Sequence, residues 1–232
     1  MLGLVAWCSV GALLIGGDPM LALELASAAV LLAWVARLAA QVWRERSVAR
    51  RLEADGFPAQ LAGVDCRLLE DLGPQALVSG WIRPRVFVGN DLLWILDEPE
   101  LHGVALHEEH HRRTRAPLRA AAVQAWLALF GRVPAMREHL VRRLIDLERQ
   151  ADRYAVSCGV TPAALASALL KTAPAEGAGA FSSAAEQRIQ GLLALDGHQP
   201  WPASGWPIEW MPPVAVIGTL ALCHVVGAVG LP

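Results

Sequence analysis

The sequence predicts a mainly α-helical membrane protein, with a transmembrane helical hairpin, a helical core that contains a small antiparallel strand element, and a C-terminal transmembrane helix. Of its 232 residues, 54% are hydrophobic and only 18% are charged, a balance typical of membrane proteins. Three long apolar runs cover residues 2–16, 20–42 and 214–231. The net charge of −2 lacks the basic excess of a nucleic-acid-binding domain, so we expect no nucleic-acid partner.

The first two apolar runs predict the hairpin. Residues 20–42 are long enough to cross about 30 Å of hydrocarbon, and a Gly-Gly-Asp-Pro turn signal at 16–19 separates them from the first run. A cleaved signal peptide is the alternative reading of residues 2–16. A signal peptide begins with positive charge, however, and the first basic residue here is Arg37.

Charge and aromatic residues predict the orientation and the domain boundaries. Arginines at 44, 46, 50 and 51 follow the second run, which indicates the cytoplasmic side. We therefore expect a hairpin domain over 1–43, a cytoplasmic core over 44–199, and a Trp/Pro-rich interfacial segment with the last span over 200–232. The protein would be a multi-pass protein of the cell inner (plasma) membrane, with the lipid bilayer as a partner.

Within the core, residues 64–69 and 85–89 read as short strands, and 75–80 as an added edge strand. Asp97 and Glu100 form a capping-box pattern that begins a helix ending near Arg115. Residues 120–129 are too few to span a bilayer and predict a buried or interfacial helix. A charged helix should cover 134–158, a loop 172–180, and another helix 183–194.

The helix after Asp97 carries the string His-Glu-Glu-His-His at residues 107–111. His107 and His111 are four residues apart, so both imidazoles project from one face and can share one Zn²⁺. Glu108 is then placed to take a proton from a zinc-activated water. His110, three residues after His107, is a competing ligand that the four-residue spacing disfavours.

A second pair of polar residues lies 37 residues further on, in the charged helix. Glu148 and Asp152 are also four apart and share a face. One carboxylate can complete the metal site, while the other accepts the free N–H of a ligand histidine and fixes its tautomer. Alone, such a pair is usually a solvated helix face.

The strings SGWIRPRVFVGNDLL, DEPELHGVALHEEHH and LERQADRYAV, following a membrane hairpin, resemble the integral-membrane zinc peptidases of the BlaR/MecR type. They are more distantly similar to the HtpX and CAAX-prenyl-protease group. The resemblance covers roughly residues 20–195 and implies a zincin-like helical catalytic core. It assigns the metal ligands to His107, His111 and Glu148, the general base to Glu108, and the orienting carboxylate to Asp152.

The resemblance also implies a substrate-binding edge strand made of Gln75, Ala76, Leu77, Val78 and Ser79. The sequence departs from the family where Glu109 and His110 replace apolar residues. It also has no histidine near Arg188 to stabilise an oxyanion.

These features predict a hydrolase: a zinc metalloendopeptidase with one Zn²⁺ per chain. It would cleave a protein or peptide substrate, such as a regulatory or membrane protein, at the cytoplasmic membrane face. The alternatives are a non-catalytic membrane signalling or scaffold protein that retains the peptidase fold, and a structural membrane protein with a coincidental motif. The sequence indicates neither the substrate nor the oligomeric state.

Overall fold

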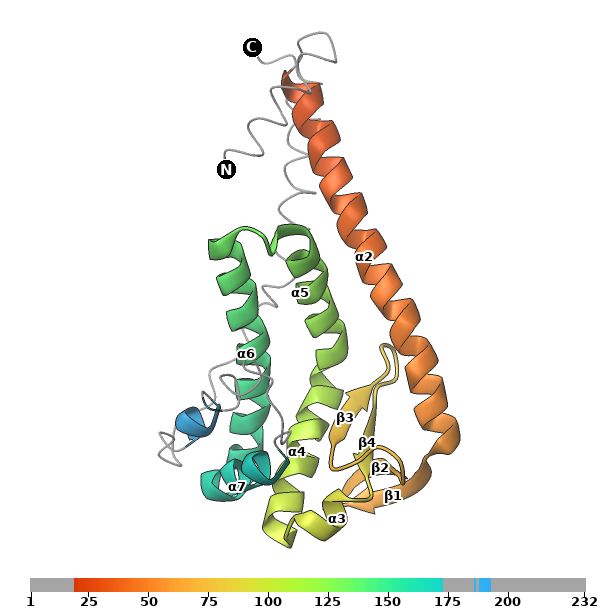
Figure 1. The fold of residues 1–232 in the computed structure, drawn as a ribbon, viewed down its shortest axis with the longest axis vertical. Coiled ribbons are helices and arrows are strands. Elements are labelled where there is room, and N and C mark those ends of the chain that lie inside the picture. The colour runs from red at the N-terminus through yellow and green to blue at the C-terminus, as the bar shows by residue number, and fades with distance from the viewer. Residues whose placement is uncertain (1–18, 173–185, 187, 193–232) are drawn as a thin grey trace.

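The computed structural model describes residues 19–172, 186 and 188–192, and the side chains from residue 25 onward. These residues form one long helix, a small sheet, and a group of helices packed beside both (Figure 1). The predictions for residues 2–16, for the loop after Thr172 and for 200–232 lie outside the described residues.

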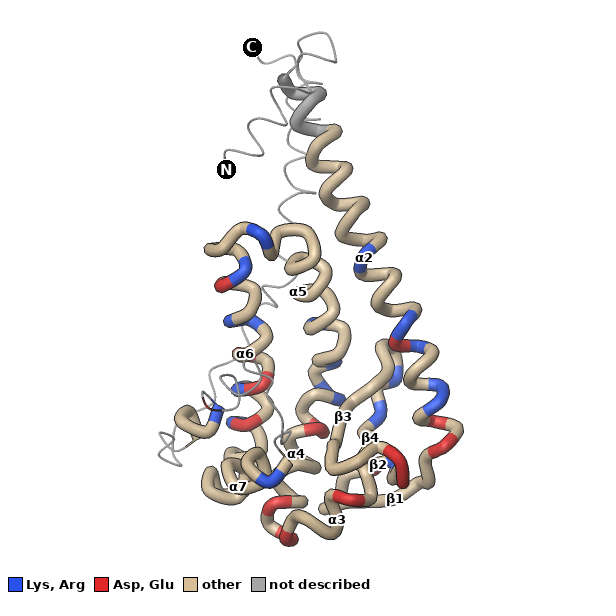
Figure 2. Tube along the Cα trace, in the orientation of Figure 1, with Lys and Arg blue, Asp and Glu red and all other residues tan. Residues whose placement is uncertain are grey.

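Helix α2 (Pro19–Asp55) is a continuous helix of 37 residues, about 55 Å long at 1.5 Å per residue. It is the one helix among the described residues that is long and apolar enough to cross a membrane. Its charged residues gather on the half nearer the sheet (Figure 2). The domain boundary predicted between residues 43 and 44 falls inside this continuous helix. Only 6% of its most apolar window is buried inside the protein.

The sheet has four strands in the order β1-β2-β4-β3, with bounds β1 (Phe57–Leu61), β2 (Val64–Leu69), β3 (Ala76–Ser79) and β4 (Arg85–Gly89). It is mixed, which corrects the antiparallel element predicted from the sequence, because β2 and β4 run parallel. The chain reverses direction between β2 and β3 and again between β3 and β4, so the neighbouring strands β2 and β4 run the same way. Val86, Phe87 and Val88 of β4 are each 1% exposed, so β4 takes the centre, and its antiparallel partner β3 is left at the edge.

Strand β1 was not predicted, because its signals are atypical. It pairs with β2 through a two-residue turn in which both Ala62 and Gly63 have positive φ, 52° and 80°. Such turns suit the twist of a hairpin but usually carry Asn or Asp before the Gly. Pro58 also reads as a strand breaker, although an edge strand tolerates it.

Helix α4 (Glu98–Thr114) begins and ends as predicted. The Asp97 side chain accepts a hydrogen bond from the N–H of Glu100, and the Glu100 side chain accepts one from the N–H of Asp97. This capping box satisfies N–H groups that the first turn leaves unpaired. Arg115, in the left-handed conformation with φ 52°, ends α4 and turns the chain into α5.

Helix α5 (Ala116–Phe130) is the predicted short apolar helix, and it packs between α2 and the next helix. Trp126 of α5 stacks on Trp34 of α2 with ring centroids 5.5 Å apart. The indole N–H of Trp34 donates to the Ala122 carbonyl. A cluster of buried residues therefore holds the apolar half of α2 to the core.

Helices α6 (Pro134–Ser157) and α7 (Pro162–Thr172) complete the group, together with the one-turn α3 (Leu92–Ile95). The sequence predicted α6 but not α7. Helix α6 lies along α4 and α5, and α7 covers the N-terminal half of α4 (Figure 1). This packing places Glu148 and Asp152 of α6 against His107 and His111 of α4.

Candidate metal centre

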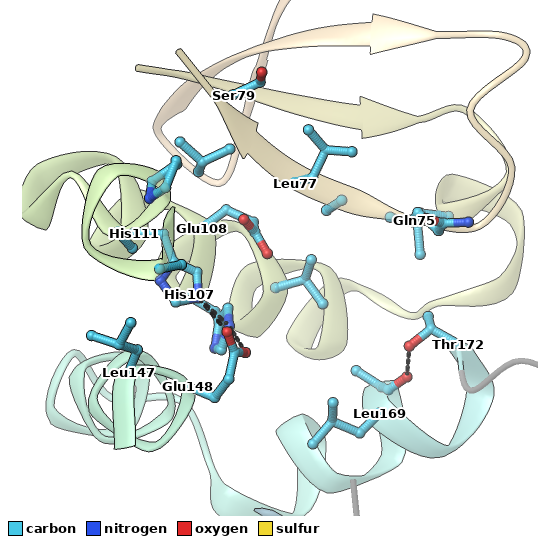
Figure 3. A pocket seen from close by; sticks show the side chains of 18 of the residues that line it. Gln75, Leu77, Ser79, His107, Glu108, His111, Leu147, Glu148, Leu169 and Thr172 are labelled. Atoms are coloured by element: carbon cyan, nitrogen blue, oxygen red, sulfur yellow. Dashed lines mark hydrogen bonds and ion pairs between the residues drawn. The ribbon is translucent and has the colours of Figure 1, made fainter. Parts of the chain in front are cut away.

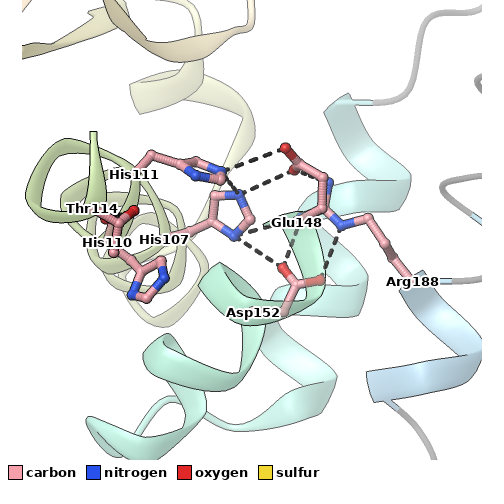
Figure 4. Close-up of polar contacts among 7 residues, drawn as sticks. All are labelled: His107, His110, His111, Thr114, Glu148, Asp152 and Arg188. Carbon is pink, nitrogen blue, oxygen red and sulfur yellow. Dashed lines mark hydrogen bonds and ion pairs between the residues drawn. The ribbon is translucent and has the colours of Figure 1, made fainter. Parts of the chain in front are cut away.

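The two histidines of the motif project from α4 toward α6, as their spacing predicts. His107 and His111 are buried, and their Nε2 atoms lie 3.0 Å apart. Glu148 reaches them from α6: one carboxylate oxygen lies 3.4 Å from His107 Nε2 and the other 3.5 Å from His111 Nε2. The three side chains converge on one point (Figure 4). They form the group among the described residues that could hold a metal ion.

Asp152 lies one helical turn beyond Glu148 and contacts the other side of His107. Its Oδ1 is 2.9 Å from His107 Nδ1, and its side chain is buried. A carboxylate at this distance accepts the Nδ1–H and leaves the Nε2 lone pair directed at the other donors. The second carboxylate that the sequence singled out therefore contacts His107 on the side opposite Glu148.

The ionisable side chains of this group shift one another's pKa values. Burial by itself would lower the pKa of His107, but hydrogen bonds to Asp152 and Glu148 outweigh burial and raise it to about 10. Burial would raise the pKa of Glu148, yet the two histidines hold it far below its usual range. Burial would also raise the pKa of Asp152, but hydrogen bonds to His107 and Arg188 outweigh burial and lower it. Because a metal ligand must be deprotonated, a bound cation would take the place of the His107 proton.

Arg188 belongs to this network, which sequence reasoning missed. Its guanidinium donates to both oxygens of Asp152, at 2.9 and 2.7 Å, and lies 3.1 Å from a Glu148 oxygen. A forked cation that bridges both carboxylates fixes their positions. The only sequence signal was an arginine in the predicted helix over 183–194, and its spacing from Asp152 corresponds to no recognised motif.

The two polar residues inside the motif point away from the metal group. Glu109 is buried, and its carboxylate accepts hydrogen bonds from Arg112 and Arg113 at 2.6–2.7 Å. His110 packs on the Tyr154 ring, with centroids 5.0 Å apart. Burial and the neighbouring histidines lower the pKa of His110 to about 4, so it is neutral at pH 7. His111, and not His110, is the second histidine of the metal group, as the four-residue spacing predicts.

A cavity of about 580 Å³ opens beside these donors and runs along strand β3. Glu108 lines it, 8% exposed, between the histidines and Leu77 (Figure 3). Among the described residues, no side chain donates a hydrogen bond to Glu108, so its carboxylate is available to a molecule in the cavity. The whole predicted edge strand, residues 75–79, lines the opposite wall.

Comparison with protein-family models and with curated proteins gives no match for this chain.

Proposed function

We propose that this chain is a zinc metalloendopeptidase of the cell membrane, built like the BlaR/MecR-type peptidases that its motifs resemble. The observation that carries the proposal is the spacing of the three donors. Tetrahedral zinc sites have bonds of about 2.0–2.1 Å, which puts neighbouring donor atoms about 3.3 Å apart. Here the two Nε2 atoms are 3.0 Å apart, each lies 3.4–3.5 Å from a different oxygen of Glu148, and one donor atom from each residue can be chosen so that all three lie within 4.8 Å of one another.

The donor set also favours zinc and catalysis. Two imidazoles and one carboxylate are the ligands of a catalytic zinc site, which keeps a further position open for water. The cavity of about 580 Å³ reaches the donors, so water and substrate have access. A bound zinc ion would lower the pKa of water toward neutrality and polarise a carbonyl group.

The protein's own residues then perform the proton transfers. Glu108 accepts a proton from the attacking water, whose oxygen bonds to the carbonyl carbon of the scissile peptide. As the C–N bond breaks, Glu108 returns that proton to the departing nitrogen, so the products are a carboxylic acid and an amine, and the remaining water proton passes from the acid to the amine to give a carboxylate and an ammonium group. Asp152 keeps His107 in the tautomer that binds metal, and Arg188 holds Asp152.

The membrane location rests on α2. Its apolar half presents large side chains such as Leu25, Leu32 and Val35 to the surroundings, 51%, 71% and 46% exposed. A core helix of a water-soluble protein would bury such residues, whereas a bilayer favours their exposure. The arginines that follow the apolar half support a cytoplasmic position for the cavity.

The test separates metal binding from turnover. In Glu108→Gln the proton acceptor is lost while the three donors stay, so zinc content should be unchanged and cleavage should fall by about 10²–10⁴-fold. Glu109→Gln is the matched control, because Glu109 is adjacent in sequence but faces Arg112 and Arg113. Zinc is measured by mass spectrometry and cleavage with a quenched fluorescent peptide. A wild-type protein that binds zinc but cleaves nothing would favour the scaffold alternative.

A further inference from the structure

Strand β3 is an unpaired sheet edge that faces the metal group across the cavity. Among the described residues it pairs with β4 on one side only, and residues 74–79 line the cavity. A sheet edge can bind an extended peptide as an additional strand, through backbone hydrogen bonds. The cavity is therefore shaped for a polypeptide in the extended conformation.

The register shows which backbone groups are available to it. The N–H of Gly89 donates to the Gln75 carbonyl at 2.8 Å. Hydrogen-bonded and non-hydrogen-bonded pairs alternate along an antiparallel ladder. Leu77 and Ser79 therefore bond to β4, whereas Ala76 and Val78 direct their N–H and C=O groups toward the cavity. Each of these two residues can exchange a pair of hydrogen bonds with one residue of an antiparallel peptide.

The two ends of the cavity differ in their position relative to α2. The Ser79 end is lined by Glu45 of α2 and by Ala116, Pro117 and Ala120 at the start of α5. The Gln75 end is lined by apolar residues of α3, α4 and α7: Leu92, Val104, Leu165, Ala168 and Leu169. Strand β3 points from the second end toward the first, in the direction of the apolar half of α2 (Figures 1 and 3).

An antiparallel peptide on β3 must run in the opposite direction. Its N-terminal part lies at the Glu45 end, nearest the membrane-crossing half of α2, and its C-terminal part leaves over the apolar end beside α7. Antiparallel pairing is the more stable of the two possibilities per residue. It also matches the paired N–H and C=O groups of Ala76 and Val78.

We infer that the substrate is a membrane-anchored polypeptide whose anchor precedes the scissile bond, so that the released product is the part C-terminal to the anchor. This inference rests on the proposed peptidase function and adds the direction in which the substrate peptide lies along β3. It predicts that an anchor placed after the scissile bond obstructs cleavage, because the peptide would have to leave the membrane, turn, and enter β3 from the far end.

The structure also sets a minimum spacing between anchor and scissile bond. Arg37 is the first charged residue after the apolar half of α2, and Glu45 lies eight residues further along, about 12 Å at 1.5 Å per residue. An extended chain covers that distance in about four residues. About two more are needed to reach the middle of β3, so the scissile bond should lie about six or more residues from the anchor.

The experiment uses the full chain in phosphatidylcholine vesicles, loaded with zinc, and three peptides of one sequence. One peptide carries two acyl chains at its N-terminus, one carries them at its C-terminus, and one carries none. We expect the N-terminally anchored peptide to be cleaved at least tenfold faster than the C-terminally anchored one. The cut should fall about six or more residues from the anchor, as read by mass spectrometry. In detergent solution, where no bilayer fixes the anchor, the difference should disappear.

Equal or faster cleavage of the C-terminally anchored peptide in vesicles would overturn the inferred direction. The proposed function would survive that result, provided that cleavage of the peptide without acyl chains depends on zinc and on Glu108. Failure to cleave any of the three peptides would count against both.

Discussion

Asp152 illustrates how a residue outside the donor group can control it. Its carboxylate is held by two hydrogen bonds from Arg188 and in turn contacts His107 Nδ1 at 2.9 Å. A neutral amide in its place could still contact the ring but would no longer stabilise the Nδ1–H tautomer electrostatically. The charge of Asp152 should therefore matter more than its shape.

We predict that Asp152→Asn weakens zinc affinity by about 10–100-fold without abolishing the site, as is typical of residues that orient a metal ligand. Competition with a fluorescent chelator measures the affinity. Asp146→Asn is the control, since Asp146 lies on the same helix but is 41% exposed and pairs with Arg143. Equal zinc affinity of the wild type and Asp152→Asn would show that Asp152 has no orienting role.

The adjacent residues His110 and His111 give a second prediction. His111→Ala should lose the metal and the activity together, because it removes one of three donors. His110→Ala should keep the metal content near that of the wild type, since His110 packs on Tyr154. Loss of zinc from His110→Ala, with retention by His111→Ala, would mean that the register of the motif is wrong.

At the scale of elements, Glu100 links α4 to α7. Its buried carboxylate accepts hydrogen bonds from Lys171 at 2.7 Å and from Ser167 at 2.5 Å, in addition to its role in the cap. Burial by itself would raise the pKa of Glu100, but these hydrogen bonds outweigh burial and lower it. A carboxyl whose folded pKa lies below its unfolded value stabilises the fold above the unfolded value and loses that effect as the pH falls.

We therefore predict that Glu100→Gln lowers the free energy of unfolding by about 1–3 kcal/mol at pH 7. The difference from the wild type should shrink as the pH falls below about 4.5, the ordinary value for this carboxyl. Glu98→Gln is the control, because Glu98 is exposed in the same first turn. Chemical denaturation at several pH values measures the free energy of unfolding of the two variants and of the wild type. A difference that is independent of pH would rule out the charge as its source.

The free edge of β3 gives a prediction of its own. Val78→Pro removes an N–H that faces the cavity and leaves the bonds to β4 intact, which an edge strand tolerates. Loss of one substrate hydrogen bond should slow cleavage by roughly tenfold, with zinc content unchanged. Val78→Ala is the control for the side chain, which packs on the core. If the two variants cleave equally fast, the substrate does not pair with Val78.

The elements also show what could be predicted from the sequence and why. Strands β2 and β4 and helices α4 and α6 have strong local signals, namely short apolar segments next to turn residues, a capping box and helical spacing, and the structure confirms them. Strand β1 was missed because its turn places Ala62 at positive φ. The parallel pairing of β2 with β4 arises because β4 inserts between β2 and β3, an order that local sequence signals do not specify.

The candidate site also contains residues that could be predicted from the sequence and one, Arg188, that could not. His107, His111, Glu148 and Asp152 could be found because each pair repeats at one helical turn. The placement of the pairs against each other depends on the packing of α6 on α4. Arg188 could not be found by spacing, since its contact with Asp152 joins residues 36 apart on elements that meet only in three dimensions.

In the molecule as a whole, α2 connects the segment that is long and apolar enough to cross a membrane with the wall of the cavity. The stacking of Trp34 on Trp126 joins the apolar half of α2 to α5, which directly follows α4 and its histidines. The charged half of α2 then brings Glu45 to the rim of the cavity. If α2 crosses the membrane as we propose, the site lies outside the bilayer but close to it.

The orientation in the membrane can be tested with a cysteine that the chain already has. Cys158 is exposed and follows the end of α6, whereas Cys66 is buried in the sheet. In a variant that retains only Cys158, a membrane-impermeant maleimide should label inside-out vesicles and not intact spheroplasts. Labelling of spheroplasts instead would place the core, with its candidate site, outside the cytoplasm.

We expect His107, His111 and Glu148 to form one zinc site that supports peptide cleavage. The most direct measurement is a titration of zinc into metal-free protein, with bound metal and cleavage rate followed in the same samples. We predict that the rate rises in proportion to bound zinc and reaches a plateau at one zinc per chain, and that His111→Ala shows neither binding nor cleavage. Cleavage that persists in metal-free protein, or zinc binding that His111→Ala retains in full, would contradict the account.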